Sequence, residues 1–561
     1  MKRIIFILSC LFFAGNLSAT EIIKVSELRP GMKGYGLSVF QGYTPERFEV
    51  ELIDIVPRAL PGTDLILVKC SGAGLEKSKI IAGMSGSPVY FEGKLAGAIA
   101  YAWGFSQDPI AGVTPIESMI SATRTAGKTI AAIPFEKSEP AISGYDLKPV
   151  GAVIMVSGLS PALLPEAKSV LESFNLGPVM MGGGAVAGAE APAILEPGSA
   201  VGVDLVSGDL SISAVGTATL VEGATVLAFG HGFFNAGAVS FPISIAKVHT
   251  VIASNAISFK FASSARELGE LNLDTMTAIS GKLGAKAKKI PVQVEVKNLA
   301  TGINSSYQYQ IANHPILGPR LVQLCLMESL EGGGAVSELA MVDLDLELKL
   351  LDYPEPIRYR DLFALVGRSF SFDYLAPLLI FSTNPYQKVK ISELKFKLEI
   401  RPDWESAEIK SIWANKTEAA PGDTVMIGVR LRKFQGEEFE KQILFTVPEN
   451  AQRAVNLRLM GGEQMPLDIA VPESVDDLIQ AFKILPSPRW LVLQYQKPGF
   501  AIDYQGERLK SLPPSAQALL AGRADTQARP APDFGYLFYE TPYLIKGRAG
   551  IQLRIKTDTR R

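Results

Sequence analysis

Gly83-Met84-Ser85-Gly86-Ser87-Pro88 has the form Gly-x-Ser-Gly-x-Pro and separates two strand-like segments of the chain. Because glycine accepts backbone conformations that other residues avoid, this stretch predicts a tight turn. A serine in such a turn can present its hydroxyl while the amides of Gly83 and Ser85 point into one small pocket. Acyl transfer needs that arrangement, a nucleophile beside N–H donors for an oxyanion. A turn selected only for its small residues is the plainer alternative.

Short strands are predicted on both sides of this turn. Residues 48–53 alternate between polar and apolar side chains, which is typical of a half-buried strand, and residues 64–68 are more uniformly apolar. Glu92-Gly93 predicts a hairpin between a strand at 89–91 and a strand at 94–103.

Composition favours a mainly β protein. The chain has 561 residues, of which 51 are glycine and 36 proline, and 47% are hydrophobic, so it can form about three or four domains with sizeable cores. Alternating strands after residue 401 indicate an immunoglobulin-like sandwich over 401–470. The formal net charge of −2 argues against a nucleic-acid partner.

Helices are expected at a few places within this β-rich pattern. The most distinct segments are 160–171, 319–330 and 476–482, and Val221-Glu222-Gly223 predicts a further hairpin turn.

The first residues are typical of a secretory signal. Lys2 and Arg3 precede an apolar run over 4–15, and Leu17-Ser18-Ala19 offers a cleavage site. No later segment is long and apolar enough for a membrane helix. We therefore expect a protein exported to the periplasm or the exterior, with no transmembrane segment after cleavage.

Cysteine and histidine usage bears on disulfides and metals. Cys70 and Cys325 remain after cleavage, and the sequence allows either a disulfide between them or two buried thiols. Histidines and cysteines lack metal-ligand spacing, so we expect neither a metal nor another cofactor.

Two blocks of the chain resemble the SpoIVB peptidase family, exported serine proteases that cut partner proteins in signalling across envelopes. The first block runs through 83–90, 93–98 and 109–119, and the second is 226–232, Val-Leu-Ala-Phe-Gly-His-Gly. The resemblance implies a trypsin-like double β-barrel peptidase region with the active site between the barrels. It also implies Ser85 as nucleophile and His231 as general base, although the two blocks follow the reverse of the family's order. Triads of this kind occur in several chain orders.

The residues themselves narrow the choice of base. The chain contains three histidines, and His231, between two glycines after an apolar segment, is better placed for presentation than His249 or His314. A core histidine satisfied by backbone groups is the alternative.

The acid is less constrained by the sequence. Asp274 is the favoured third member of a triad, and Asp64, Asp204 and Asp209 are alternatives. A Ser–His dyad, or a triad completed by a backbone carbonyl, is also open. The plainer interpretation of Asp274 is a turn-capping aspartate.

These observations give a domain plan and two hypotheses about function. The plan is a signal peptide at 1–19, a serine-bearing β-barrel at 20–130, a linker or helical segment at 131–190, a histidine-bearing β-barrel with an extension at 191–400, the sandwich at 401–470 and a β-rich C-terminal module at 471–561. The leading hypothesis is an exported serine endopeptidase that acts on a protein or peptide substrate, with the β-rich C-terminal modules recruiting substrate or an envelope protein partner. The alternative is a catalytically inactive envelope scaffold or peptide-binding protein built on the same barrels.

Overall fold

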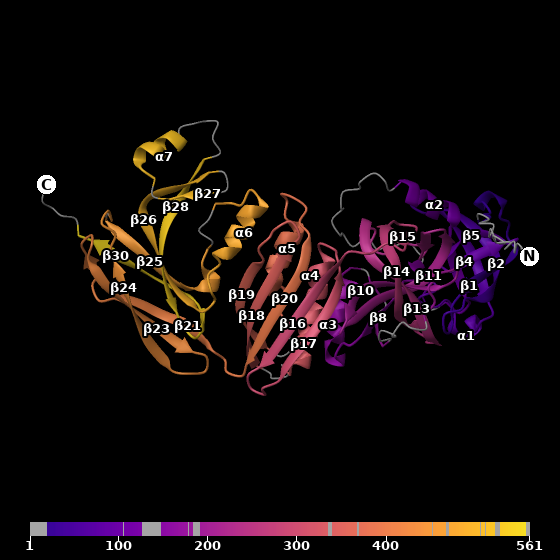
Figure 1. The fold of residues 1–561 in the computed structure, drawn as a ribbon, viewed down its shortest axis with the longest axis horizontal. Coiled ribbons are helices and arrows are strands. Elements are labelled where there is room, and N and C mark those ends of the chain that lie inside the picture. The colour runs from indigo at the N-terminus through magenta and orange to yellow at the C-terminus, as the bar shows by residue number, and fades with distance from the viewer. Residues whose placement is uncertain are drawn as a thin grey trace, which may run out of the picture. The chain divides into compact units, whose positions relative to one another are not determined.

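The computed structural model describes residues 20–104, 106–125, 147–174, 176–177, 179–182, 191–334, 339–366, 370–451, 453–466, 470–504, 507–510, 512–521 and 528–556. The expected signal peptide at 1–19 lies outside these residues. The chain divides into two compact units. Unit 1 comprises Met1–Ser157, Leu171–Leu205 and Ser211–Ala287, and unit 2 comprises Gly158–Val170, Val206–Leu210 and Lys288–Arg561. The protein is mainly β, as the composition predicts (Figure 1).

Unit 1 begins with a sheet that closes on itself. Its strands follow the order β1 (Lys33–Ser38), β2 (Glu46–Leu60), β3 (Thr63–Ser71), β6 (Ile110–Pro115), β5 (Lys94–Trp103) and β4 (Pro88–Phe91), and β4 pairs with both β5 and β1. We call this closed sheet the first ring. The helices η1 (Val25–Glu27), α1 (Leu75–Ser78) and α2 (Ile116–Thr125) and the short strand β7 (Leu147–Pro149), which pairs with β5, accompany it.

The sequence pattern explains the first ring locally. Phe48, Val50 and Leu52 of β2 are buried in its core, as the alternation predicts. Glu92 and Gly93 take positive φ values of 53° and 77° and join β4 to β5, which confirms the expected hairpin.

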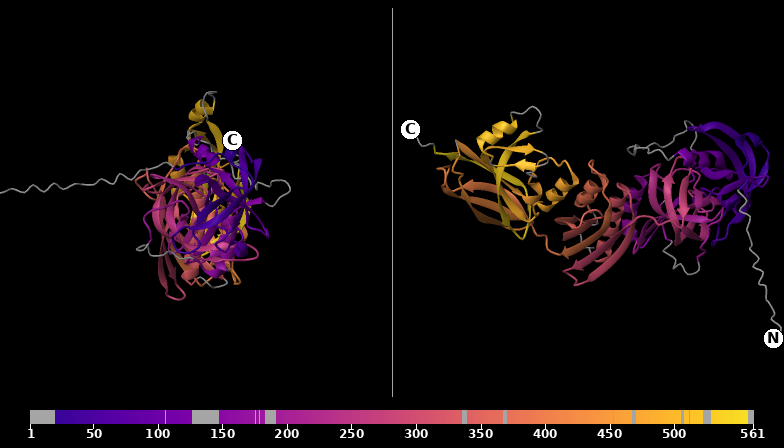
Figure 2. Two further views of the ribbon diagram at one scale, coloured as in Figure 1. Left: turned by 90° about the vertical axis from the view of Figure 1, so that its right-hand side faces the viewer. Right: turned by 45° about the horizontal axis from the view of Figure 1, so that its top comes forward.

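A second closed sheet follows in the same unit. Its order is β10 (Ala200–Gly208), β13 (Gly237–Ile252), β14 (Phe259–Asp274), β15 (Ile279–Leu283), β12 (Thr225–Ala228) and β11 (Ser211–Glu222), and β11 pairs back with β10. The strands β8 (Val153–Ser157) and β9 (Val179–Met181) extend this second ring beyond β11. Figure 2 shows the first ring in indigo and the second in purple to magenta. The hairpin expected at Val221-Glu222-Gly223 joins β11 to β12.

Unit 2 contains an open sheet in the order β17 (Asn304–Ala312), β16 (Lys289–Asn298), β20 (Ile391–Arg401), β18 (Leu339–Leu350) and β19 (Ile357–Val366). Its helical elements include α4 (Leu317–Gly332), η4 (Phe372–Leu375), α5 (Ala376–Thr383) and α6 (Val475–Lys483). The helices expected at 319–330 and 476–482 are thus confirmed as α4 and α6. The one expected at 160–171 is η2 (Pro161–Leu163) followed by α3 (Leu164–Glu172).

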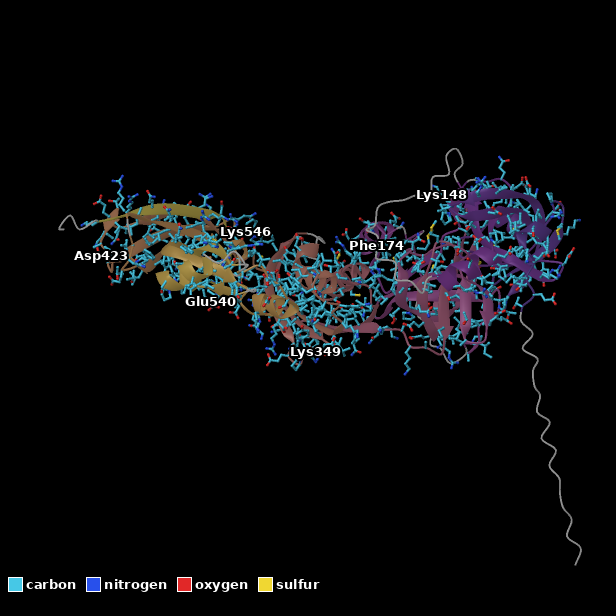
Figure 3. All side chains as sticks on the ribbon, turned by 90° about the horizontal axis from the view of Figure 1, so that it is seen from above. Lys148, Phe174, Lys349, Asp423, Glu540 and Lys546 are labelled. Atoms are coloured by element: carbon cyan, nitrogen blue, oxygen red, sulfur yellow. The ribbon has the colours of Figure 1, made fainter. Side chains whose placement is uncertain are left out.

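The C-terminal part of unit 2 consists of two sheets around one core. One sheet has the order β24 (Glu438–Thr446), β23 (Thr424–Lys433), β21 (Ser406–Ala414) and β29 (Leu544–Lys546). The other has the order β22 (Glu418–Ala419), β30 (Arg548–Ile555), β25 (Ala454–Gly461), β26 (Trp490–Tyr504) and β27 (Glu507–Leu509), with β28 (Arg529–Glu540) also paired to β26. The short helices η5 (Gly462–Gln464) and α7 (Pro514–Ala521) lie in the connections. Side chains from both sheets, among them Ile427, Phe445, Leu457 and Leu493, meet in the core. Figure 3 shows the described side chains on the ribbon, with Asp423, Glu540 and Lys546 of these two sheets and their connections labelled.

Two further expectations concern thiols and membranes. Cys70 and Cys325 are both buried free thiols, which decides between the two possibilities that the sequence leaves open. Burial raises the pKa of Cys70 to about 12, so this thiol is unreactive in the folded protein. None of the described helices has the length and apolar character needed to cross a membrane.

Candidate functional site

Ser85 lies in a tight turn between α1 and β4, which we call the serine turn (residues 83–87). Gly83 and Gly86 have φ values of +98° and +95°, so the prediction that glycine shapes this turn is confirmed. A methyl group on Gly86 would lie 2.0 Å from the carbonyl oxygen of Thr217 and 2.5 Å from the amide nitrogen of Phe229. The absence of a side chain at Gly86 therefore allows the serine turn to pack directly against the second ring.

Strand β11 fixes the carbonyl groups of the serine turn. The Thr217 N–H donates to the Ser85 carbonyl (2.8 Å), and the Thr217 hydroxyl donates to the Gly83 carbonyl (2.9 Å). The Thr219 hydroxyl donates to the Gly86 carbonyl (2.7 Å). These bonds fix the planes of the 83–84, 85–86 and 86–87 peptides. The 84–85 peptide, which carries the Ser85 N–H, is held by the Ser87 N–H, which donates to the Met84 carbonyl (2.9 Å).

The two N–H groups predicted as oxyanion donors are only weakly engaged. The Gly83 N–H makes one long bond, 3.4 Å, to the carbonyl of Gly151. The Ser85 N–H has no hydrogen-bond acceptor among the residues that the structure describes. In contrast, the Met84 N–H is held by the Ile81 carbonyl at 2.9 Å. The oxyanion role of Gly83 and Ser85 stays a prediction.

His231 follows β12 in a segment that packs against the same turn. Phe229 and Gly230 both take left-handed backbone conformations, with φ values of 71° and 70°. Such a conformation is strained for a bulky residue like Phe229 and is stable only where the surroundings impose it. The Thr114 hydroxyl of the first ring donates to the Gly230 carbonyl (2.6 Å), and the Phe229 backbone contacts Gly86. The histidine segment and the serine turn are therefore in direct contact.

The imidazole of His231 is buried and uncharged. Its Nδ1 lies 2.7 Å from the carbonyl oxygen of Gly232. Because a carbonyl only accepts hydrogen bonds, Nδ1 carries the proton and Nε2 carries the lone pair. Burial lowers the pKa of His231 below its usual value, so this neutral tautomer is the form present near neutral pH.

Two buried polar atoms in unit 1 have no hydrogen-bond partner among the described residues. They are Ser85 Oγ and His231 Nε2. Buried polar side-chain atoms are normally paired, and the exceptions often mark chemical function. The two atoms are not hydrogen-bonded to each other, although the segments that carry them touch. Ser85 is fully buried and His231 is 5% exposed.

Asp274 lies at the end of β14 and binds the backbone that follows His231. Its carboxylate accepts hydrogen bonds from the N–H groups of Phe233 (2.8 Å), Phe234 (2.5 Å) and Ala236 (3.2 Å). Burial raises the pKa of Asp274 to about 6, and these N–H groups oppose that rise. The geometry corresponds to the turn-capping alternative, and Gly232 supplies the backbone carbonyl that orients the imidazole. A catalytic role for Asp274 stays a prediction.

Comparison of the chain with protein-family models, with curated proteins and with solved structures gives no match in any of the three. The chemistry of the site therefore has to be argued from its geometry.

The other candidate acids and bases bind elsewhere. Asp204 accepts from the hydroxyls of three serines of the second ring, Asp64 from the Arg58 N–H, and Asp209, in unit 2, from the Gln308 N–H. His249 Nε2 is paired with the Ser263 hydroxyl at 2.7 Å, as befits a residue on the face of a strand. His314 accepts from the Leu317 N–H at the start of α4.

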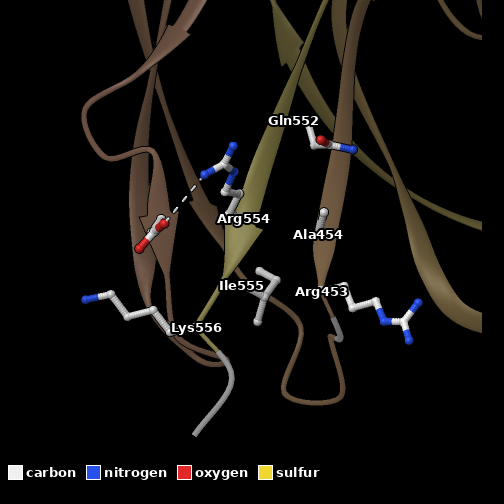
Figure 4. Close-up of a pocket in the computed structure, with 7 residues that line it drawn as sticks. Arg453, Ala454, Gln552, Arg554, Ile555 and Lys556 are labelled. Atoms are coloured by element: carbon white, nitrogen blue, oxygen red, sulfur yellow. Dashed lines mark ion pairs between the residues drawn. The ribbon is translucent and has the colours of Figure 1, made fainter. Parts of the chain in front are cut away.

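A pocket of about 590 Å³ in unit 2 is built differently. Arg453, Gln552, Arg554 and Lys556 line it together with Glu418, which forms an ion pair with Arg554 at 4.0 Å (Figure 4). It is an open surface of mixed charge and contains none of the predicted site residues. The described residues also contain no group of three or more His, Cys, Asp or Glu side chains placed to hold a metal ion.

Lys260 also lies beside the serine turn, and its local sequence gives no sign of this. This residue of β14 is completely buried, and its Nζ donates to Ser38 Oγ (2.9 Å) and to Thr217 Oγ1 (3.2 Å). Its partners are distant in sequence, so the only local signal is its place in the alternating run Phe259-Lys260-Phe261. That alternation suggests an exposed lysine rather than a buried one.

Proposed function

We propose that this protein is an exported serine endopeptidase with Ser85 as nucleophile and His231 as general base. The proposal includes a trypsin-like double barrel, which is supported by two closed rings that each contain six strands in the part of the chain described. It also includes an immunoglobulin-like character for the C-terminal sheets, which would recruit substrate or an envelope partner. The resemblance of 83–119 and 226–232 to the SpoIVB peptidase family points the same way.

One observation carries the proposal. Of the described side chains in unit 1, a serine hydroxyl and an imidazole nitrogen are the buried polar groups left without partners, on two segments in direct contact. The free imidazole nitrogen is the one with the lone pair. A structural role alone would favour satisfying both groups, because an unsatisfied buried polar group destabilises a fold by about 1–3 kcal/mol.

The chemistry follows from these groups. His231 Nε2 takes the proton of Ser85 as Oγ bonds to the carbonyl carbon of a peptide, and the carbonyl oxygen becomes an oxyanion that the N–H groups of Gly83 and Ser85 stabilise. The C–N bond then breaks, and the imidazolium gives its proton to the leaving amine. Water attacks the acyl-enzyme in the same way and regenerates Ser85. The Gly232 carbonyl accepts from Nδ1–H throughout and keeps the ring oriented.

A catalytically inactive scaffold is the second candidate. The full burial of Ser85, and the lack of a hydrogen bond between Ser85 and His231, favour it. For catalysis, the histidine segment has to move far enough to admit a substrate and bring Nε2 to Oγ. Catalytic hydrogen bonds are often long or absent before substrate binds, so this geometry is compatible with an enzyme.

A fluorophosphonate probe distinguishes the two candidates, because it reacts far faster with an activated serine than with an ordinary one. We expect the wild-type protein to be labelled, Ser85→Ala to be unlabelled and His231→Ala to be labelled at least a hundredfold more slowly, roughly the effect of removing a general base. Ser78→Ala removes another buried serine of unit 1 and should leave labelling unchanged. Absence of labelling of the wild-type protein across a range of pH, or labelling that survives Ser85→Ala, would favour the scaffold.

A further inference from the structure

Lys260 connects the two rings beside the serine turn. It belongs to β14 of the second ring, while Ser38, one of its partners, ends β1 of the first ring. The aliphatic part of Lys260 lies along Gly83, where a methyl group would be 3.1 Å from the lysine Cδ. The Lys260 backbone N–H also donates to the carbonyl of Ala82, just before the turn (3.0 Å).

The hydrogen-bond partners of Lys260 match an uncharged amine. Thr217 Oγ1 gives its proton to the Gly83 carbonyl, so toward Lys260 it can only accept. Ser38 Oγ accepts from the Ser87 hydroxyl (3.0 Å) and from Lys260. A neutral amine has two N–H groups, and an ammonium has three. The described residues provide acceptors for two.

We propose that Lys260 is a positioning residue of the Ser85 site, which in its uncharged form holds the serine turn to both rings through Thr217 and Ser38. The inference rests on the proposed function, since positioning matters only if Ser85 reacts. Thr217 holds the carbonyls of both Gly83 and Ser85, so a group that orients Thr217 fixes the backbone of the turn before and after the nucleophile. The Lys260 backbone N–H also holds the Ala82 carbonyl, whose peptide carries the Gly83 N–H. Protonation of Lys260 adds a buried charge and a third N–H, and loosens the turn.

The surroundings of Lys260 contain no compensating charge. The titratable groups on the strands packed against it are Lys33 and Tyr35 of β1, Glu222 of β11, and Lys247 and His249 of β13, and the serine turn has none. None of these groups contributes to the electrostatics of Lys260, and burial alone lowers its pKa to about 7. The neutral amine that the hydrogen bonds require is thus present above neutral pH.

The first experiment measures the positioning network without any catalysis. Hydrogen exchange of β11 and β14 amides is followed against pH in the Ser85→Ala chain, with and without Lys260→Met. Because the folded state disfavours the ammonium, stability rises with pH from about 7 up to pH 9.0, the ordinary thiol pKa, above which the raised pKa of buried Cys70 opposes the rise. With Lys260 present, the opening equilibrium constant therefore falls by about tenfold per pH unit in that window. Lys260→Met should abolish this dependence, whereas Lys282→Met, at an exposed site on β15, should retain it. An unchanged dependence in Lys260→Met would overturn the proposal.

The second experiment measures reactivity at Ser85. We expect Lys260→Met to react with the fluorophosphonate at least tenfold more slowly than the wild type above neutral pH, and Lys282→Met to react normally. Labelling of the wild type should decline as the pH falls through about 7, because Lys260 becomes protonated. The residual labelling of Lys260→Met should depend only on the protonation of His231, and should therefore decline at a pH below the ordinary pKa of histidine. Equal rates and equal pH profiles would refute positioning. If the wild type is not labelled at all, the proposed function and with it the positioning role fail, and the exchange experiment still decides whether the uncharged amine holds the turn.

A third measurement covers the case in which Lys260→Met does not fold. In the unaltered chain labelled with ¹³C at lysine Cε, one resonance should titrate near pH 7. Titration of every lysine resonance near the ordinary lysine pKa would contradict the uncharged amine.

Discussion

Thr217→Val tests the network around the nucleophile most sharply among single substitutions. Valine has nearly the shape of threonine, so the substitution removes a hydroxyl without opening a cavity. It deletes the 2.9 Å bond to the Gly83 carbonyl and the acceptor for Lys260 at 3.2 Å, and it retains the backbone bond to the Ser85 carbonyl. The matched control is Thr219→Val, which loses only the 2.7 Å bond to the Gly86 carbonyl.

The expected magnitudes follow from these contacts. A buried carbonyl left without a donor destabilises a fold by about 1–3 kcal/mol, and loss of one typical hydrogen bond contributes about 1 kcal/mol. We therefore expect Thr217→Val to lower the stability of unit 1 by about 2–4 kcal/mol, and Thr219→Val by about 1–3 kcal/mol. Both threonines are fully buried, so solvent does not replace the lost partners.

Hydrogen exchange of β11 amides is a suitable assay, because it reports on unit 1 separately from unit 2. Combining each threonine variant with Lys260→Met gives a double-mutant cycle. The cycle for Thr217 should show a coupling of about 1 kcal/mol with Lys260, and the cycle for Thr219 should show none. Equal couplings for the two threonines, or no coupling for Thr217, would refute the network as described.

Other substitutions test separate parts of the account. Gly86→Ala places a methyl group 2.0 Å from the Thr217 carbonyl oxygen at a φ of +95°, and we expect it to destabilise unit 1 by about 3–6 kcal/mol in thermal unfolding. Gly93→Ala, whose methyl group would lie in open space, should destabilise unit 1 by only about 1–2 kcal/mol. Similar losses for the two variants would contradict the close packing of Gly86 against the second ring. Asp274→Asn puts an amide nitrogen against backbone N–H groups and should lower stability in hydrogen exchange by about 2–4 kcal/mol. Asp64→Asn, at a half-buried carboxylate that accepts from a single backbone N–H, should have a smaller effect, and unchanged stability in Asp274→Asn would argue against the capping role. Cys70 and Cys325 should resist thiol reagents until the protein is unfolded, and reduction should leave the intact mass unchanged; a mass increase on reduction would indicate a disulfide.

Local sequence signals predict much of the fold. The strand expected at 94–103 is β5, the hairpin at Glu92-Gly93 joins it to β4, and the helix expected at 319–330 is α4. Each of these depends on patterns within about a dozen residues: alternation, a turn dipeptide or a helical apolar face. The closure of the two rings depends on pairings between distant strands, such as β1 with β4, and no local pattern specifies them.

The candidate site shows the same limit. The serine turn and the histidine segment have distinctive glycines, so both could be selected from the sequence. The contact between them could only be hypothesised. Neither Thr217 nor Lys260 could be identified, because their roles arise from contacts with residues distant in sequence, namely 83 and 85 in the serine turn and 38 on β1. For Asp274, the sequence left a triad role and a capping role open. Only the structure shows that its carboxylate accepts hydrogen bonds from backbone N–H groups within residues 233–236, as a capping residue does.

The central claim is that Ser85, as nucleophile, and His231, as general base, act together on one scissile peptide bond. The most direct test is a crystal structure of the full chain after reaction with a fluorophosphonate. The account predicts phosphorus bonded to Ser85 Oγ, its oxygen facing the N–H groups of Gly83 and Ser85, and His231 Nε2 within hydrogen-bond reach of the adduct. An unmodified Ser85, or an adduct on another residue such as Ser38, would contradict it.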